Sequence, residues 1–473
     1  MKRGRWFRSF VLLVILMVIF NSCSHKLGPL DPNKPITVTI WHYYNGAVKS
    51  RFDALVARFN DTIGIEQGVV IEAQSYGDVN ELADAAFRAA NKSIGAQPMP
   101  DIFAAYPDNA FRVDKISELV DLETYFTKEE LSAIRKEFLE EGRFGKDLKL
   151  KILPIAKSTE NMYLNKTYWD KFAAETGAKI DDLSTWEGIR KTAEMYFNHT
   201  GKAFFSIDSN ANFILSACNQ LGEELYTYDG DSAELNFSEN KAYKIWENFY
   251  VPYIYGYYEK TGRFSSDDAK TGKIIAYTGS TAGASYCPTE VAEGNTSVPV
   301  EVLTLPYPYF EGGERYVIQQ GAGMCITKSD EAHEYGAALF LKWFIEEAQN
   351  VQFSVATAYF PVKDAALKEE ILLEEVKKEN ISVKAIESSI KTTMDMFDKY
   401  KFYGNRPFVG SYQMRSLLEN NLFDDMQRDL QFLKDRLKKG ENKNEVVEKL
   451  VSKENFKKWY KQFQEKTSQI ITN

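Results

Sequence analysis

Aromatic and polar side chains follow the strands that we predict near the start of the chain. These strands cover residues 36–41, 69–73 and 100–104, and a helix is predicted after each. Flat aromatic faces pack on the C–H surfaces of a hydroxylated solute, while their polar tips bind its hydroxyl groups. The chemistry of such residues is binding rather than bond making. The candidates after the first and third strands are Trp41, Tyr43, Tyr44, Asn45, Tyr106 and Asp108.

Some of these residues also have a structural interpretation. Trp41 ends a strand and is as consistent with core packing as with binding. Asp108 is consistent with the start of a turn, which is a common position for Asp. His42 is interpreted as a structural histidine. Tyr43 and Tyr44 lie beyond the strand, so binding is favoured for both.

Small hydroxyl residues form two further candidate groups. Ser158 and Thr159 follow Lys157, directly after an apolar strand over residues 149–156 that we interpret as a crossing between domains. Residues 278–283 predict a turn that opens a helix and exposes backbone N–H groups to an anion or a hydroxyl. A plain tight turn is the alternative. The candidates in this turn are Gly279, Ser280 and Thr281.

Motifs of covalent or metal-dependent catalysis are missing from the sequence. We find no GxSxG, no HExxH and no Cys/His arrangement, and the four histidines lack paired spacing. We therefore expect no metal site, no cofactor and no enzyme activity. Paired carboxylates discriminate nothing in a chain with 67 acidic residues, so a secreted hydrolase is kept as the enzyme alternative. The net charge of −9 argues against a nucleic-acid partner.

The N-terminus carries a targeting signal. A basic start, an apolar run over residues 10–20 and two small residues precede Cys23, an order typical of a secretory signal. It resembles a bacterial lipoprotein signal, in which the cysteine thiol is diacylated, although Phe20 replaces the usual Leu. An ordinary N-terminal membrane anchor is the alternative. We predict a signal peptide over 1–22, lipidation of Cys23, a tether over 23–35 and an extracytoplasmic location.

Length and patterning predict an α/β protein with two domains. A chain of 473 residues is longer than a single hydrophobic core commonly supports, which favours two domains. Strands that alternate with helices favour parallel sheets with right-handed crossovers. Ligands bind such sheets at the carboxyl ends of the strands. The predicted helices include 48–59, 79–90, 113–120, 331–348 and most of 411–473, and the later strands include 203–207, 274–277 and 320–326. An apolar segment over 300–305 is interpreted as a second crossing. Cys218, Cys287 and Cys325 allow one disulfide at most.

The order of landmarks resembles the extracellular solute-binding proteins of bacterial ABC importers, above all the subgroup with maltose-binding and glycerol-3-phosphate-binding proteins. The resemblance covers about residues 36–473. Its pieces are Ile40-Trp41-His42 with Gly46, Pro100-Asp101-Ile102, Leu153 to Thr159 with Tyr163 and Asn165-Lys166, Thr185-Trp186, Gly279-Ser280-Thr281, Gly321-Ala322-Gly323, Leu341-Lys342-Trp343 and Ala358 to Val362.

The resemblance implies a two-lobed periplasmic-binding-protein fold of type II. Two α/β lobes would be joined by hinge strands, with the solute in the cleft and closure by hinge bending. Lobe 1 would contain residues 36–151 and 306–345, and lobe 2 residues 153–304 and 346–473. The implied partners are a small polar solute and ABC permease subunits, beside a membrane that holds the lipid anchor. A monomer is expected.

The glycerol-3-phosphate-binding relatives imply a more specific ligand set. The matching positions are Ser158, Ser280, Gly321, Tyr359 and Arg415, where the guanidinium would bind phosphate bidentately. Two positions depart from that pattern. The acidic residue after the third strand falls on Pro107, with Asp108 one place along, and the stacking aromatic falls near Ala211.

Three functions are therefore compared. The leading hypothesis is a membrane-anchored receptor that captures a sugar or sugar-like polyol for an ABC permease. Binding of sn-glycerol-3-phosphate or a glycerophosphodiester is the alternative ligand chemistry. A binding lipoprotein that signals or adheres, and a secreted hydrolase, complete the set.

Overall fold

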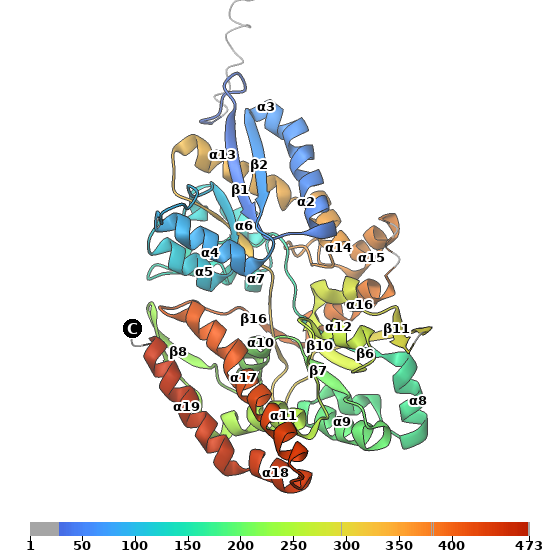
Figure 1. Cartoon of the computed structure of the whole chain (residues 1–473). Helices are drawn as coiled ribbons and strands as arrows, with labels where there is room; N and C mark the ends of the chain where they lie inside the picture. Colours follow the sequence, from blue (N-terminus) through green and yellow to red (C-terminus); the bar gives the residue numbers. More distant parts are fainter. Residues whose placement is uncertain (1–27, 295, 380, 382, 472–473) are drawn as a thin grey trace, which may run out of the picture.

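Two four-stranded sheets form the centres of two lobes in the computed structural model, which describes residues 28–294, 296–379, 381 and 383–471. The predicted signal peptide and Cys23 lie outside the described residues. Figure 1 shows the sheet with the first strands in the upper half, the C-terminal helices in the lower half, and extended segments that run between the halves. The predicted two-lobed α/β architecture is confirmed.

The first sheet has the strand order β15–β3–β1–β2, in which β1 is parallel to both β2 and β3, and β15 is antiparallel to β3. β1 pairs with β2 from Ile36 opposite Val69 to His42 opposite Ser75. Helices α2, α4 and α13 pack against this sheet. The strands are β1 (Ile36–His42), β2 (Val69–Ser75), β3 (Ile102–Ala105) and β15 (Gly323–Ile326). The four strands predicted here are confirmed to within a few residues.

Local sequence explains α4 (Val79–Ala90) well. The Asp78 side chain caps the helix by accepting from the N–H groups of Asn80 and Glu81, and small or apolar residues at helical spacing face inward. The helix predicted over 113–120 is wrong. The helix here is α5 (Pro107–Asp114), which begins at a proline in its first turn. Asp108 and Asn109 therefore lie in a helix rather than in a loop.

The second sheet has the order β13–β6–β10–β7, with β6 antiparallel to both of its neighbours and β10 parallel to β7. The strands are β6 (Glu160–Asn165), β7 (Phe205–Ile207), β10 (Ala276–Ser280) and β13 (Val302–Leu305). The segment 300–305 is thus a strand of this sheet, and its interpretation as a second crossing is wrong. Residues 278–280 belong to β10, so the predicted turn begins later, at the short 3-10 helix η4 (Thr281–Tyr286).

Helices and small hairpins complete the two lobes. The helices not yet bounded are α2 (Gly46–Phe59), α3 (Ile65–Gln67), α6 (Lys128–Ser132), α7 (Lys136–Glu140), α8 (Lys166–Thr176), α9 (Trp186–Thr200), α10 (Asn210–Gln220), α11 (Glu239–Tyr255), α12 (Ser265–Lys270), α13 (Glu331–Phe344), α14 (Glu347–Ala356), α15 (Glu369–Lys378), α16 (Lys384–Lys399), α17 (Ser411–Lys438), α18 (Lys443–Leu450) and α19 (Lys453–Ile471). The short strands are β4 (Arg143–Phe144), β5 (Lys149–Leu150), β8 (Tyr226–Asp229), β9 (Ser232–Leu235), β11 (Glu290–Glu293), β12 (Thr296–Pro299), β14 (Tyr316–Ile318) and β16 (Lys401–Tyr403).

Three extended segments meet between the lobes. The first crossing contacts the segment before β15 through bridges that join Leu153 to Met324 and Ser158 to Gln320. Lys157 pairs with Phe360 of a third segment, which follows α14. The first crossing was predicted from its apolar run. The other two segments are recognised as crossings only from their pairing with distant parts of the chain.

The predicted lobe boundaries stay a prediction, and packing departs from them at two places. α14 packs on α2 of the first lobe, although residues 346–473 were assigned to the second. β14 pairs with β16 and packs on α10, although residues 306–345 were assigned to the first. Cys218, Cys287 and Cys325 are buried free thiols. Within the described part of the chain, no helix has both the length and the apolar character needed to cross a bilayer.

Candidate ligand-binding site between the lobes

Three tyrosines from separate segments converge where the crossing segments meet. Tyr43 follows β1, Tyr106 is the residue before α5, and Tyr359 follows α14. The Tyr43 and Tyr359 hydroxyls share a hydrogen bond, and the Tyr106 hydroxyl accepts from the N–H of Gly321. Burial raises the pKa of all three phenols, and neighbouring tyrosines raise those of Tyr43 and Tyr106 further. All three hydroxyls are therefore neutral at physiological pH, and those whose O–H is not used in the Tyr43–Tyr359 hydrogen bond can donate to a solute.

Arg415 approaches this cluster from α17, in the second lobe. Its Nη2 donates to Asn212 Oδ1 at 3.0 Å, and Asn212 Nδ2 donates to Glu160 Oε1 at 2.8 Å. Both ends of the Asn212 amide are thus used, which fixes the orientation of the amide. Arg415 also acts electrostatically on Tyr106 and on Glu141, so its half-buried cation lies beside the tyrosine cluster.

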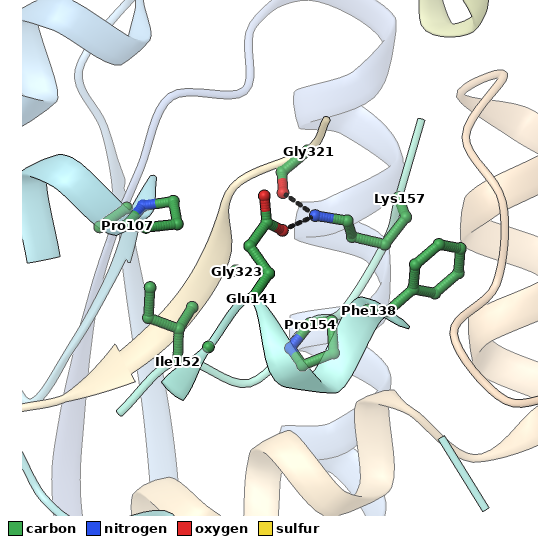
Figure 2. A pocket seen from close by; sticks show the side chains of 10 residues that line it. Pro107, Phe138, Glu141, Ile152, Pro154, Lys157, Gly321 and Gly323 are labelled. Carbon is green, nitrogen blue, oxygen red and sulfur yellow. Dashed lines mark hydrogen bonds and ion pairs between the residues drawn. The ribbon is translucent and has the colours of Figure 1, made fainter. Parts of the chain in front are cut away.

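A buried ion pair lies at the base of the first lobe, on a narrow pocket that opens to solvent. Glu141 follows α7 and accepts from Lys157 Nζ, which also donates to the carbonyl of Gly321 at 3.1 Å (Figure 2). Burial raises the pKa of Glu141, and the Lys157 ammonium opposes that shift. Gly321 has φ +94°, and a Cβ at that position would lie 2.5 Å from the carbonyl oxygen of Ala156. Only glycine allows this close approach of the two crossing segments.

A wider groove of about 990 Å³ opens from the same carboxylate toward solvent. Its first-lobe wall includes Lys136 and Glu141, and its second-lobe wall includes Phe402, Gly404 and Arg406. Glu141 lines both the pocket and the groove.

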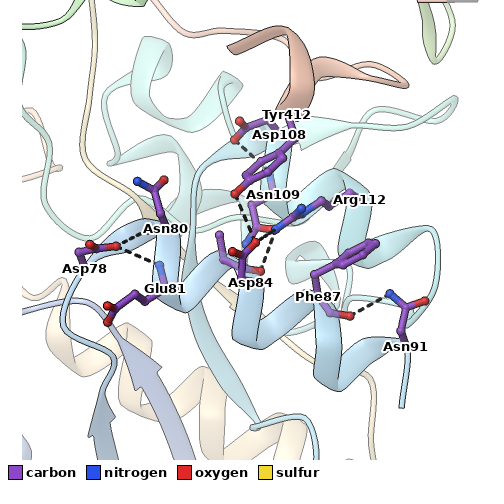
Figure 3. Close-up of polar contacts among 11 residues, drawn as sticks. Asp78, Asn80, Glu81, Asp84, Phe87, Asn91, Asp108, Asn109, Arg112 and Tyr412 are labelled. Carbon is purple, nitrogen blue, oxygen red and sulfur yellow. Dashed lines mark hydrogen bonds and ion pairs between the residues drawn. The ribbon is translucent and has the colours of Figure 1, made fainter. Parts of the chain in front are cut away.

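The lobes also touch outside this region. The Arg112 guanidinium of α5 lies 3.6 Å from the ring centroid of Tyr412 at the start of α17 (Figure 3). Asp84 of α4 lies within 3.4 Å of Arg112 Nη2 and accepts from the Tyr412 hydroxyl at 3.5 Å. An ion pair between Lys115 and Asp231, at 2.5 Å, adds a second contact.

Comparison with protein families decides the identity. The model of the bacterial extracellular solute-binding protein family matches residues 54–382, more than two thirds of the chain. The chain belongs to this family. Its members are solute-binding receptors rather than enzymes, so the resemblance found in the sequence is confirmed. A search of curated proteins found no match.

Solved structures of binding proteins share the fold of this one. The cyclic α-maltosyl-1,6-maltose-binding protein of Arthrobacter globiformis has 19% identity and a TM-score of 0.63, covering 88% of this chain and 96% of its own. UgpB of Mycobacterium tuberculosis, solved with glycerophosphocholine, has 18% identity and a TM-score of 0.62, covering 85% and 99%. The substrate-binding protein Lmo0181 of Listeria monocytogenes, solved with cycloalternan, has 14% identity and a TM-score of 0.62, covering 90% and 99%. At these identities the likeness establishes the fold alone.

The binding protein brings together half of the residues predicted for its site. Ser280 Oγ lies 3.4 Å from Ser158 Oγ, at the ends of β10 and of the first crossing. With the tyrosines and Arg415 they surround the meeting point of the three segments. The residues that converge are Tyr43, Tyr106, Ser158, Ser280, Gly321, Tyr359 and Arg415.

The other predicted residues have structural contacts instead. Trp41 and Tyr44 are 4% and 3% exposed in the first-lobe core, where Trp41 packs on Tyr76 and Tyr44 on Phe52. Asn45 is exposed and donates to the Gly77 carbonyl.

Hydroxyl groups near the crossing are also used within the fold. The Thr159 hydroxyl donates to the carbonyl of Ile318, and the Thr281 hydroxyl accepts from the N–H of Thr159. Gly279 lies inside β10, where a Cβ would make only ordinary contacts. Asp108 is buried and accepts from the N–H of Asn109.

Several polar residues near the site were missed. Asp208 follows β7, so the rule that ligands bind beyond strand ends would have identified it from the predicted strand 203–207. It accepts from the N–H of Ser265 at 2.7 Å, and burial raises its pKa. Glu141, Glu160 and Asn212 gave no local signal, because only the crossing of distant segments brings them together.

Proposed function

We propose that the protein is the lipid-anchored receptor of an ABC importer and captures a sugar or sugar-like polyol between its lobes. Closure around the solute by hinge bending would present the loaded form to the permease. The observation that carries the proposal is the convergence of Tyr43, Tyr106 and Tyr359 on the meeting point of the crossing segments. Aromatic surface with neutral hydroxyl donors suits a polyhydroxylated solute. The sugar ligands of the Arthrobacter and Listeria proteins support the same class.

Arg415 favours a second candidate, sn-glycerol-3-phosphate or a glycerophosphodiester. The guanidinium is half-buried and donates to the amide of Asn212 rather than to a carboxylate. It therefore keeps its charge available for a phosphate, which guanidinium groups bind through paired hydrogen bonds. The glycerophosphocholine bound by the Mycobacterium protein supports this class.

A thermal-shift panel separates the two candidates. The probes are maltotriose, glycerol-3-phosphate and glycerophosphocholine, each added to the purified protein. A ligand at 100 times its Kd stabilises the folded state by about 2.7 kcal/mol, which raises the Tm measurably. We expect the probes of one ligand class, either the sugar or the glycerol phosphates, to raise the Tm. If no probe does, the proposed ligand classes are wrong.

Arg415→Ala then tests whether the ligand carries a phosphate. For a phosphate ligand we expect at least a tenfold loss of affinity, because a charge-assisted pair is removed. For a neutral sugar the loss should be smaller. Arg428→Ala is the matched control, since Arg428 is on the same helix with a side chain 64% exposed. Equal binding of glycerol-3-phosphate by Arg415→Ala and the wild type would contradict a role for Arg415.

A further inference from the structure

The carboxylate of Glu141 enters the small pocket at the base of the first lobe. It comes from the residue that directly follows α7, and its side chain is 10% exposed. Pro107, Ile152 and Pro154 form apolar walls around it (Figure 2). Burial of a carboxylate among apolar side chains costs free energy unless a cation balances its charge and donors occupy its hydrogen-bond positions.

Only one of its two oxygens is satisfied within the described part of the chain. Oε2 accepts from Lys157 Nζ, and Lys157 is itself 2% exposed and tied to the carbonyl of Gly321. No hydrogen bond from a described residue to Oε1 is found, and Figure 2 draws none to the second carboxylate oxygen. Oε1 is not among the fully buried unpaired atoms, so it is accessible from the pocket. An ionised carboxylate accepts at both oxygens, so one acceptor position is left for a molecule that enters the pocket.

The groups around Glu141 connect this acceptor to the solute site. Arg415 and Asp108 act on the Glu141 carboxylate electrostatically, and Glu141 acts in turn on the Tyr106 phenol. Glu141 also lines the wider groove, so its side chain faces both spaces. The Lys157 ammonium opposes the rise that burial causes in the Glu141 pKa, and its hydrogen bond holds Oε2 in one position.

We infer that Glu141 is a specificity-determining residue of this receptor, whose Oε1 accepts a hydrogen bond from a hydroxyl group at the inner end of the solute. The inference rests on the proposed function and deepens it. A sugar or a glycerol moiety supplies the O–H donor. A solute with a methyl group at that end leaves the acceptor unpaired, and one with an anionic group there is repelled. A buried group left without its partner is the strongest source of discrimination between similar ligands.

Two pairs of probes test the assignment. The first is glycerol-3-phosphate with propyl phosphate, which lacks both hydroxyls, and the second is maltose with its monodeoxy derivatives. Titration calorimetry measures each probe on the wild type and on Glu141→Gln. We expect the substitution to weaken the hydroxylated member by about tenfold or more and to leave the deoxy member that lacks the contacted hydroxyl within about twofold. The matched control is Glu140→Gln, because Glu140 is the preceding residue with a side chain 55% exposed.

A purely structural role gives a different pattern. Loss of the buried ion pair would then weaken both members of a pair equally, and this outcome would overturn the inference. Unchanged affinity in Glu141→Gln would do the same. If Glu141→Gln does not fold, Glu141→Asp replaces it. This variant keeps the carboxylate but shortens the side chain by one methylene. The same selective loss of affinity for the hydroxylated probe is expected.

Failure of the Glu141 assignment and failure of the proposed function give different binding results. Binding of a probe by the wild type with no selective loss in the Glu141 variants removes only the role of Glu141. If the wild type binds neither pair, the proposed ligand classes fail and the inference falls with them.

Discussion

Among single residues, Glu160 has the most unusual environment in the network that holds Arg415. Its side chain is buried, accepts from Asn212 at 2.8 Å and lies near the carboxylates of Asp208 and Glu419. Burial is the main reason that its pKa rises from 4.5 to about 7, and the two carboxylates raise it further, while donors such as Asn212 lower it. Near neutral pH this carboxyl is therefore only partly ionised.

This shift makes stability depend on pH in a defined direction. Between about pH 4.5 and 7, the unfolded chain releases the Glu160 proton while the folded chain keeps it. The folded state binds more protons in this window, so the contribution of Glu160 to the free energy of unfolding falls as pH rises and is constant above it. Glu160→Gln removes this dependence. We expect its stability relative to the wild type to increase across the window by up to about 3 kcal/mol.

Urea unfolding of both proteins between pH 4.5 and 8 measures the difference. Glu448→Gln, a change of an exposed carboxylate on α18, is the control. Parallel stability profiles for Glu160→Gln and the wild type would show that the carboxyl titrates normally.

At the scale of elements, the approach of the two crossing segments depends on Gly321. Its φ of +94° is strained for any residue with a Cβ, and that atom would collide with the Ala156 carbonyl at 2.5 Å. We expect Gly321→Ala to lower the free energy of unfolding by about 1–3 kcal/mol from the backbone conformation alone. It should also weaken solute binding, because Gly321 contacts both Tyr106 and Lys157.

Chemical denaturation and calorimetry with the best probe measure these two effects. Gly283→Ala is the control, because Gly283 lies in η4 with no atom within 4 Å of its added Cβ. Equal stability of the two variants would mean that the crossing segments adjust without cost.

Elements with a strong local signal were predicted well. β1, β2 and α4 were found because alternation, helical spacing and the Asp78 cap are properties of short stretches of sequence. The helix over 113–120 was misplaced because its apolar residues belong partly to an extended segment, where Leu119 pairs with Thr327. Residues 300–305 were recognised as an apolar segment but interpreted as a crossing. The partner strand β6 is distant in sequence, so the place of this segment in a sheet was not predictable locally.

At the scale of the whole molecule, the site is assembled from segments that are far apart in the chain. Tyr43, Glu141, Gly321, Tyr359 and Arg415 come together only through the crossing of the lobes. The resemblance to a known family indicated several of these positions, because it carries the fold with it. It gave no indication of Glu141, whose position depends on how α7 and the first crossing pack in this protein.

Contacts between the lobes also set how readily the cleft closes. Arg112 is held within the first lobe, where it donates to Asn109 at 2.7 Å and to the Ala83 carbonyl at 2.9 Å. The same guanidinium lies between the ring of Phe87, at 4.5 Å, and the ring of Tyr412, at 3.6 Å (Figure 3). Its position is therefore fixed before Tyr412 of the second lobe meets it, which keeps the entropic cost of the contact low.

Tyr412→Ala tests this contribution, because it removes the contact between lobes and leaves the bonds of Arg112 within the first lobe intact. A cation–π contact contributes about 0.5–2 kcal/mol, so the closed population should fall and the measured Kd of the solute should rise about two- to thirtyfold. Calorimetry measures the Kd, and X-ray scattering should show a larger radius of gyration for the variant. Tyr412→Phe keeps the ring on Arg112 and loses the hydroxyl contacts with Asp84 and Arg112, so it should bind within about twofold of the wild type. Unchanged affinity and scattering in Tyr412→Ala would mean that closure is determined by the solute and the crossing segments alone.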